Sequence, residues 1–210
     1  MSNAPEEQRH RHMKRRGQII AIGLIAIVAL PMLLAYVLYF TGVGVPDESV
    51  NEGTLLSPPQ PFMDWQPETA EGEAWTLDED RKRWRLLVPI DADCTGHCED
   101  NLYLTRQVHV RLAEKAYRVE RLILPLDGRI SDEMSEFLKQ EHPGVEVLYP
   151  DSGSLAASLG KTNLAENPID VGRYYLMDQE GFVMMGYTPE HRGKQLLKDI
   201  KRLLRYSYED

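Results

Sequence analysis

Residues 86–98 decide the fold, and they read Leu-Leu-Val-Pro-Ile-Asp-Ala-Asp-Cys-Thr-Gly-His-Cys. The apolar run from Leu86 to Ile90 is typical of a buried strand. Cys94 and Cys98, the only two cysteines in the chain, follow it and precede a stretch with helical periodicity. Unpaired N–H groups and a partial positive charge at a helix start favour a thiolate. The sequence therefore predicts a reactive sulfur pair between a strand and a helix, with a static structural bridge as the alternative.

Strand and helix signals alternate on both sides of this stretch. Before it, residues 75–77 and 83–90 flank a charged turn and predict a hairpin. After it we expect a helix of about 18 residues with apolar positions three and four apart. The remaining predicted elements are a strand at 119–126, a helix capped by Ser131 and ending at His142, a strand at 145–149, a helix at 152–159, strands at 174–177 and 182–187, and a last helix that begins at Thr188-Pro189-Glu190. This order predicts an α/β fold with a mixed central sheet and helices on both faces.

The N-terminal part of the chain predicts a membrane anchor. Residues 18–40 are apolar and carry no charge, which is long enough to cross a bilayer. Five Lys and Arg precede the span and acids follow it, so the positive-inside rule keeps residues 1–17 in the cytoplasm. A cleaved signal peptide is the alternative, but the apolar run is too long and lacks a clear cleavage site. We expect a Pro-rich exported tether at 41–73 and a globular domain at 74–210.

The charge distribution limits the partners of the exported part. Beyond residue 16 the chain holds 19 Lys and Arg against 31 Asp and Glu, a net charge of about −12. Such a surface is a poor nucleic-acid binder and attracts basic partners or cations. Outside the cytoplasm a thiol pair is a disulfide, a redox couple or a soft-metal site.

The order of elements, with Cys-x-x-x-Cys after the first long strand, resembles the Sco/SenC branch of the thioredoxin superfamily. These are membrane-anchored proteins that take part in assembling the copper centre of cytochrome c oxidase. The resemblance covers about residues 74–204, including the motif at 90–98 and the stretch Ile169–Gly181. In the tether, Asn51, Gly53 and Leu55 follow an Asn-x-Gly-x-Leu pattern similar to that of anchored bacterial oxidase-assembly proteins. The resemblance implies a thioredoxin-like domain, preceded by one transmembrane helix, on the periplasmic side of a bacterial inner membrane.

The chain departs from that family at two places. Sco proteins usually carry prolines within and after the cysteine motif, and none occurs between Cys94 and Asp100. The family also places a copper-binding His just after an Asp in the loop before the Tyr-Leu strand. Here Asp170 is followed by Val171 and Gly172, so the third ligand is missing. The chain is therefore identified as a divergent member that lacks the usual distal His.

Two chemistries remain open for Cys94 and Cys98. In thiol–disulfide exchange, Cys94 is the expected attacking thiol and Cys98 the resolving one. In copper handling, both thiolates are ligands that suit Cu(I), and His97 is the candidate third ligand. The acids around the pair, Asp91, Asp93, Glu99 and Asp100, oppose a thiolate and attract cations.

The other histidines and the strand methionines favour structural roles. We expect His109 to pack in mid-helix, His142 to be charged by the dipole of the helix that it ends, and His191 to be structural. Met177, Met184 and Met185 are expected to fill the core rather than to bind metal.

The expected function is that of an assembly factor for a copper-containing respiratory oxidase, at most a thiol–disulfide oxidoreductase. Its partners would be an oxidase subunit or other assembly factors. The alternative is a non-catalytic anchored scaffold whose Cys94–Cys98 disulfide is structural.

Overall fold

The computed structural model describes residues 4–41, 50–78, 80–164 and 172–207, and the chain divides into two compact units, residues 1–49 and 50–210. The described residues of the first unit form the helix α1 (Ala4–Thr41). Within it, the stretch Ile22–Thr41 has a mean hydropathy of 2.4 and is long and apolar enough to cross a membrane. The predicted N-terminal apolar helix is confirmed.

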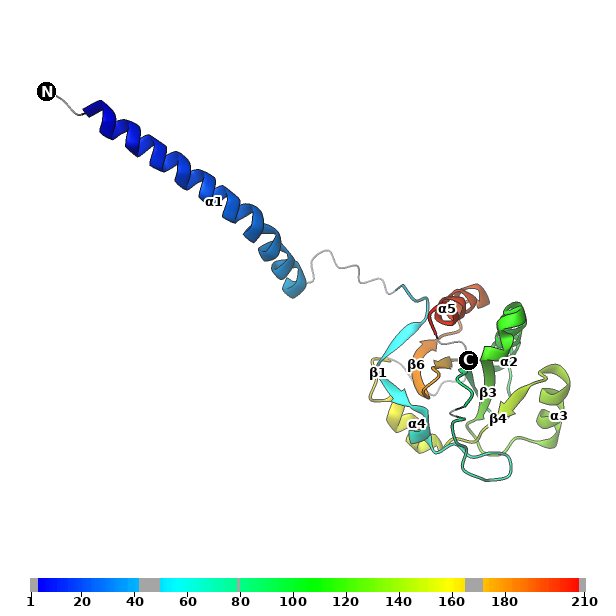
Figure 1. Ribbon diagram of the computed structural model, residues 1–210. Helices are drawn as coiled ribbons and strands as arrows, with labels where there is room; N and C mark the ends of the chain where they lie inside the picture. The colour runs from blue at the N-terminus through cyan, green and yellow to red at the C-terminus, as the bar shows by residue number, and fades with distance from the viewer. Residues whose placement is uncertain (1–3, 42–49, 79, 165–171, 208–210) are drawn as a thin grey trace. The chain divides into compact units, whose positions relative to one another are not determined.

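The second unit is built on one six-stranded mixed sheet in the order β1-β6-β5-β2-β3-β4 (Figure 1). The strands are β1 (Thr54–Pro61), β2 (Trp84–Ile90), β3 (Val119–Pro125), β4 (Val145–Val147), β5 (Tyr174–Met177) and β6 (Phe182–Tyr187). The strands β2, β3 and β4 are parallel to one another. The strand β5 runs antiparallel to β2, β6 runs antiparallel to β5, and β1 runs antiparallel to β6. The predicted α/β fold with a mixed sheet is confirmed.

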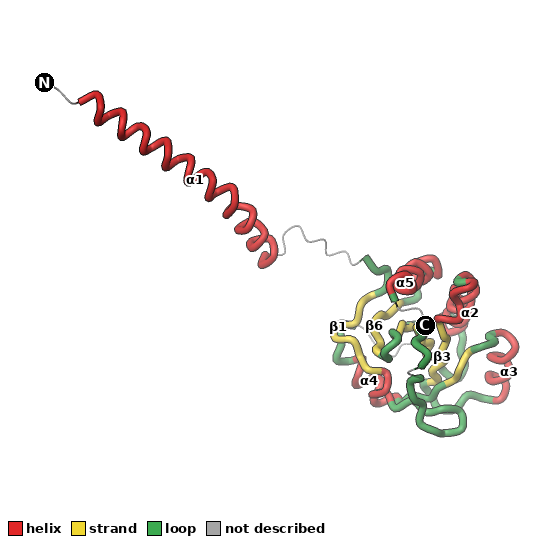
Figure 2. Tube along the Cα trace, in the orientation of Figure 1, coloured by secondary structure: helices red, strands yellow, loops and turns green. Residues whose placement is uncertain are grey.

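Helices cover both faces of this sheet. They are α2 (His97–Arg111), α3 (Asp132–Glu141), α4 (Ser152–Leu159) and α5 (Gly193–Tyr206), with the 3-10 turns η1 (Phe62–Trp65) and η2 (Ala113–Arg118). One hydrophobic core lies between the sheet and α2, α3 and α5, and the other between the sheet and α4 and η1. The strands, yellow in Figure 2, thus form the middle layer.

The central strand β2 supplies side chains to both cores. Leu86, Val88 and Ile90 point into the first core, while Leu87 points into the second. Every residue of β2 is buried, including Arg85, and the apolar run from Leu86 to Ile90 is what a strand covered on both faces requires. The position of β2 places the end of the strand, and the cysteines that follow it, at the carboxyl edge of the parallel strands.

Two predictions on the N-terminal side of the domain are wrong. The stretch 75–77 forms no hairpin with β2; the N–H group of Trp75 instead donates to the carbonyl of Pro67 at 2.8 Å. The first strand of the sheet is β1, inside the stretch 41–73 that the sequence predicts as a tether. The compact unit therefore begins at Val50 and not at residue 74.

The apolar residues of this stretch explain the difference. Leu56, Phe62 and Trp65 are buried in the second core, so residues 54–65 contribute to the domain interior. The prolines of β1 conceal the strand in the sequence. An edge strand tolerates them because only one of its sides must donate hydrogen bonds, and the pairing with β6 is irregular between Leu55 and Gln60.

The segment Val50–Gly53, which we call the clasped segment, is held against α5. The buried carboxylate of Asp199 accepts hydrogen bonds from the N–H groups of Glu52 and Gly53 at 3.0 Å each through Oδ2. The same oxygen accepts from the hydroxyl of Tyr187 at 3.1 Å. Gly53 is needed here because a Cβ would lie 2.6 Å from the Tyr187 ring. This contact gives a structural reason for the glycine of the Asn-x-Gly-x-Leu pattern.

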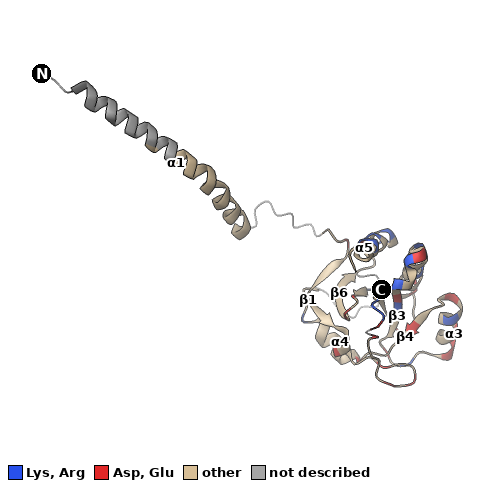
Figure 3. Cartoon of the chain, in the orientation of Figure 1, with Lys and Arg blue, Asp and Glu red and all other residues tan. Residues whose placement is uncertain are grey.

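Helix α5 begins later than the sequence predicts. The residues Thr188 to His191 form a turn in which the N–H group of Thr188 donates to Nδ1 of His191 at 3.0 Å. The helix starts at Gly193, where the N–H group of Arg192 donates to Oε1 of Gln195 at 2.8 Å. Its apolar face packs in the first core, and its outer face carries lysines and arginines, drawn blue in Figure 3.

We expect the substitution Gly53→Ala to lower the free energy of unfolding of the Val50–Asp210 unit by about 1–3 kcal/mol. The added methyl group would collide with Tyr187, whose buried ring is stacked on Tyr174 and cannot move aside. Urea unfolding followed by circular dichroism measures the change.

Gly153→Ala is the matched control, because a Cβ at this exposed position of α4 meets only an ordinary contact of 3.5 Å with Asp151. That variant should be neutral or more stable by up to about 1 kcal/mol, since Ala favours a helix over Gly. Equal changes in the free energy of unfolding for the two substitutions would contradict the close contact of Gly53 with Tyr187.

Candidate thiol–disulfide site

The two cysteines lie where β2 passes into α2. After Ile90 the chain turns through a short loop, and α2 begins at His97. Cys94 in the loop and Cys98 in the first turn of the helix are joined by a disulfide, with their Cα atoms 5.0 Å apart. The structure therefore brings the predicted sulfur pair together at the carboxyl edge of the sheet.

Local hydrogen bonds and one glycine shape this loop. The N–H group of Cys94 donates to Oδ1 of Asp91 at 2.7 Å, so Asp91 helps to hold the loop. Cys94 has φ +35°, a left-handed conformation that is uncommon for a residue with a side chain. Gly96, with φ +59° and ψ −118°, supplies the conformation from which α2 starts. The N–H group of Asp100 then donates to the carbonyl of Gly96 at 3.0 Å, which begins the helix.

The two sulfur-bearing residues differ in exposure. Both are buried and belong to the first hydrophobic core, but Cys94 is 8% exposed whereas Cys98 is 0% exposed. A sulfur that a partner attacks must be reachable, and a sulfur that completes the exchange needs access only to its neighbour. The exposure thus has the order expected for Cys94 as the attacking residue and Cys98 as the resolving one.

Acidic residues surround the disulfide. Asp93, Glu99 and Asp100 are exposed, and Asp91 is half-buried. Their negative charge opposes the thiolate that the start of α2 favours, so the two effects act against each other. The same negative charge makes the electrostatic potential at this edge of the sheet favourable for cations.

The position where the resembling family offers a His can be located only in part. Asp170 and Val171 lie outside the described residues. The carbonyl of Gly172 accepts a hydrogen bond from Nδ2 of Asn101 at 3.1 Å, and Asn101 lies in α2, three residues after Cys98. This contact, which the sequence did not reveal, joins the end of that loop to α2 close to the disulfide.

A third metal ligand is not evident near the sulfurs. Among the described residues, no group of three or more His, Cys, Asp and Glu side chains could hold a metal ion. His97 is exposed at the first position of α2. Met177 and Met185 are fully buried in different cores, and Met184 packs on the first core. The cysteine pair is therefore the soft donor set that the described part of the chain offers.

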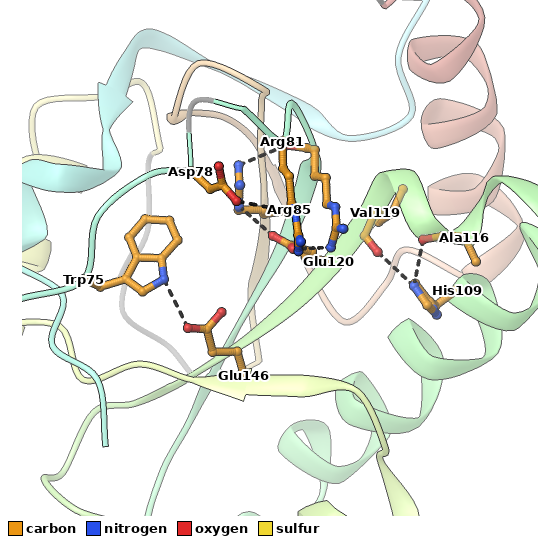
Figure 4. A network of polar contacts seen from close by, with 10 residues as sticks. Trp75, Asp78, Arg81, Arg85, His109, Ala116, Val119, Glu120 and Glu146 are labelled. Atoms are coloured by element: carbon orange, nitrogen blue, oxygen red, sulfur yellow. Dashed lines mark hydrogen bonds and ion pairs between the residues drawn. The ribbon is translucent and has the colours of Figure 1, made fainter. Parts of the chain in front are cut away.

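Two further histidines of the Val50–Asp210 unit, His109 and His191, contact backbone carbonyl groups. Nε2 of His109 lies 2.8 Å from the carbonyl oxygen of Val119 and 3.1 Å from that of Ala116 (Figure 4). Burial lowers the pKa of His109, which favours the neutral ring. Nε2 of His191 lies 2.9 Å from the carbonyl oxygen of Glu52.

The expectation of a charged His142 is wrong. The side chain is 3% exposed, and its burial, together with the nearby Arg121 and Arg106, lowers its pKa to about 4. Desolvation of the ring and repulsion by the arginines exceed the attraction of the helix dipole, which is worth about 0.3–1 kcal/mol at an exposed site. His142 is therefore neutral at neutral pH.

A polar network lies at the other end of β2, away from the disulfide. Glu120 accepts from Nε of Arg85 at 2.9 Å and from Nη1 of Arg83 at 2.6 Å (Figure 4). Trp75 donates from Nε1 to Oε1 of Glu146 at 3.1 Å, and the Arg85 guanidinium lies 5.7 Å from the Trp75 ring centroid. Burial lowers the pKa of Arg85 and raises the pKa of Glu146. The network fastens the Trp75 segment to the sheet and is separate from the cysteine chemistry.

Solved structures share this fold at low sequence identity. The crystal structure of yeast Sco1 with copper bound has a TM-score of 0.53 and 17% identity, and covers 77% of this chain and 97% of that chain. Apo Sco1 from Thermus thermophilus has a TM-score of 0.55 and 18% identity, with 75% and 99% covered. BsSco, described as a member of the Sco family of cytochrome c oxidase assembly proteins with a disulfide switch, has a TM-score of 0.52 and 12% identity, with 76% and 100% covered. These similarities define the domain as thioredoxin-like and Sco-like in fold.

Two family patterns match the sequence itself. The C-terminal domain of the transmembrane-like, thioredoxin-like family matches residues 84–207, and the transmembrane-like N-terminal domain matches residues 11–42. The chain belongs to this transmembrane-like, thioredoxin-like family. No curated protein matches the sequence.

The buried His142 predicts a loss of stability in acid. Because its pKa is about 4 in the folded state and about 6.5 when unfolded, the unfolded chain binds the proton first as the pH falls. The stability is therefore unaffected by this group above pH ~6.5 and falls as the pH drops towards ~4. The loss of free energy of unfolding reaches about 2–3 kcal/mol by pH ~4.5. Urea unfolding at several pH values measures this loss.

The substitution His142→Gln removes the titrating ring and should flatten the pH dependence between pH ~6.5 and ~4.5. If the variant and the parent protein lose the same stability over this range, the neutral, buried state of His142 is disproved.

Proposed function

We propose that this protein is a membrane-anchored thiol–disulfide exchange protein that serves the assembly of a copper-containing respiratory oxidase. The observation that carries the proposal is the Cys94–Cys98 disulfide at the start of α2, with Cys94 8% exposed and Cys98 0% exposed. A thioredoxin-like fold positions a sulfur pair there, where helix N–H groups stabilise the departing or attacking thiolate.

Acting as a reductant, the protein would transfer two electrons to a partner disulfide in two steps. The thiolate of reduced Cys94 attacks one sulfur of a partner disulfide, and the other partner sulfur leaves as a thiolate that takes up a proton. The Cys98 thiolate then attacks Sγ of Cys94, which breaks the mixed disulfide and releases the second partner thiol. The partner gains two electrons and two protons, and the protein returns to the Cys94–Cys98 disulfide.

Two observations support the oxidase as the target. The domain has the fold of Sco proteins, one of which is described as a cytochrome c oxidase assembly protein. Helix α1 supplies an apolar segment able to hold the domain beside a membrane-bound partner. On this proposal the partner is an oxidase subunit or another assembly factor.

The proposed topology places the reactive domain in the periplasm of a bacterial inner membrane. The basic residues before the apolar span favour a cytoplasmic N-terminus, and a single span then exports everything that follows. A disulfide persists in that oxidising compartment, in keeping with the paired state of the two cysteines.

Cu(I) handling is the second candidate function. Two thiolates suit Cu(I), and the four acids near the pair add attraction for a cation. Once the disulfide is reduced, Cys94 and Cys98 would be the ligands, with His97 as the nearest candidate for a third. A fixed structural disulfide in a scaffold is the remaining alternative, and the reduction potential separates it from both active roles.

For an exchange protein we expect a reduction potential above about −300 mV, because structural disulfides lie below that value. The potential is measured by equilibrating the protein with dithiothreitol buffers and counting the free thiols by mass spectrometry. In the single variants, Cys94 of Cys98→Ser should form a mixed disulfide with glutathione disulfide faster than Cys98 of Cys94→Ser, owing to its exposure. A potential well below −300 mV, or equal rates, would favour the scaffold.

For copper handling we expect the reduced protein to bind Cu(I) and to bind Cu(II) poorly, because two thiolates leave Cu(II) without the nitrogen donor it prefers. Competition with a chromophoric Cu(I) chelator measures the affinity, and Cys94→Ser or Cys98→Ser should abolish binding. Tight Cu(II) binding through a thiolate would reveal a further ligand, for which His97→Ala is the first variant. If the protein binds neither Cu(I) nor Cu(II) while the cysteine pair is still reduced and reoxidised readily, copper handling is excluded and thiol–disulfide exchange stands as the proposed function.

A further inference from the structure

The charges of the domain are unevenly distributed, and α5 is rich in bases. Residues 50–210 hold 29 Asp and Glu against 19 Lys and Arg. Helix α5 alone contains five of these bases and a single acid, Asp199, whose side chain is buried in the clasp. The outer surface of this helix is therefore positive on a domain that is otherwise acidic.

The bases of α5 share one face. At about 100° per residue, they fall within an arc of about 100° on the helix, opposite the buried Leu196, Ile200 and Leu204. All five are exposed: Lys194, Lys198, Lys201, Arg202 and Arg205. We call this surface the basic face of α5. The apolar face of α5 is already used in the core, so a partner of the basic face would be held by charge and not by insertion of apolar side chains.

The clasped segment brings the chain from α1 to this face. Nη1 of Arg202 donates to the carbonyl of Val50 at 2.9 Å, and nearer the start of the helix Lys198 forms an ion pair with Glu52 at 2.5 Å. The chain therefore arrives at the C-terminal half of α5 and runs towards its N-terminal half. The point of arrival lies on the part of the helix that also carries the exposed Arg205 and Tyr206.

Chain length limits how far this point can lie from the anchor. Eight residues separate Thr41, the end of α1, from Val50. An extended chain spans at most about 3.6 Å per residue, so Val50 lies no more than about 32 Å from Thr41. If α1 spans a membrane, the basic face of α5 is tethered next to the membrane surface.

We propose that the basic face of α5 binds the anionic phospholipid headgroups of the membrane that holds α1. Lysines and arginines next to a membrane are attracted to anionic lipids, and an exposed aromatic residue such as Tyr206 suits the interface. A lipid surface is favoured over an acidic protein because the chain that leads to the membrane arrives at this face. The inference rests on α1 as an anchor, and it assigns α5 a role that the cysteine chemistry does not use.

Lysine acetylation in nanodiscs tests the proposal with the full chain. The protein is inserted into discs of phosphatidylcholine alone or of phosphatidylcholine with about 30 mol % phosphatidylglycerol, and reacted briefly with an acetylating ester. Lys194 and Lys201 should react several-fold more slowly in the anionic discs. The difference should vanish in about 0.5 M salt, which screens charges over a few ångströms. Lys115 and Lys139, exposed on η2 and α3, serve as internal references and should not change.

The double variant Lys201→Glu/Arg205→Glu should restore the reactivity of Lys194 in anionic discs, and the matched variant Lys115→Glu/Lys139→Glu should leave its protection intact. Equal reactivity of Lys194 in both kinds of disc would overturn the proposal. Protection that appears in detergent and grows with protein concentration would also overturn it, in favour of an acidic surface on a second copy. Whether the protein stays with the discs in high salt tests separately that α1 is a membrane anchor. Loss of the protein from the discs would overturn both the anchor role of α1 and the lipid binding of α5.

Discussion

The buried carboxylate of Asp199 is the contact on which the arrangement of the domain depends. It accepts hydrogen bonds from the backbone of Glu52 and Gly53 and from the hydroxyl of Tyr187. A buried carboxylate is tolerated only when its oxygens are paired in this way. Through these bonds one side chain of the last helix joins the start of the domain to the last strand. The proximity of Asp199, and above all burial, raises the pKa of Tyr187, so its hydroxyl stays a donor.

The Asp199 contacts and the disulfide lie at different places, but both border the first core, on the face of the sheet that α2 and α5 cover. Helices α2 and α5 pack side by side on one face of the sheet, and their apolar side chains form one core with Cys98. Tyr174, stacked on Tyr187 with ring centroids 4.9 Å apart, belongs to that core as well. The sulfur that completes the proposed exchange is therefore held inside the first core by α2, while Cys94 lies in the loop that precedes this helix.

Two surfaces of the domain then carry opposite charge. The edge around the disulfide bears exposed acids, and the outer face of α5 bears bases. With an anchor helix on the N-terminal side of the clasped segment, this polarity offers a physical basis for orienting the reactive edge with respect to a membrane. Electrostatic attraction of this kind acts over about 10 Å at 0.1 M salt, which is enough to bias a tethered domain.

The sequence by itself determined the apolar N-terminal helix, the strand β2, the cysteine pair after it and most later elements. These features are local: unbroken apolar runs, caps such as Ser131, whose hydroxyl oxygen accepts from the N–H group of Met134, and period-3.6 patterns are all present within a few residues. It also indicated correctly that the two cysteines lie close together, because they are only four residues apart in the chain.

Only the tertiary structure decided at which residue the domain begins. The prolines of 54–61 hide a strand, because whether an edge strand forms depends on a partner, β6, that lies more than 120 residues away. The same is true of His142, whose charge depends on its burial and on the nearby Arg121 and Arg106, and not on its own helix. The Asn101 contact with Gly172 and the Asp199 clasp likewise join residues distant in sequence. Burial and long-range pairing set these contacts, and neither leaves a periodic signal in the chain.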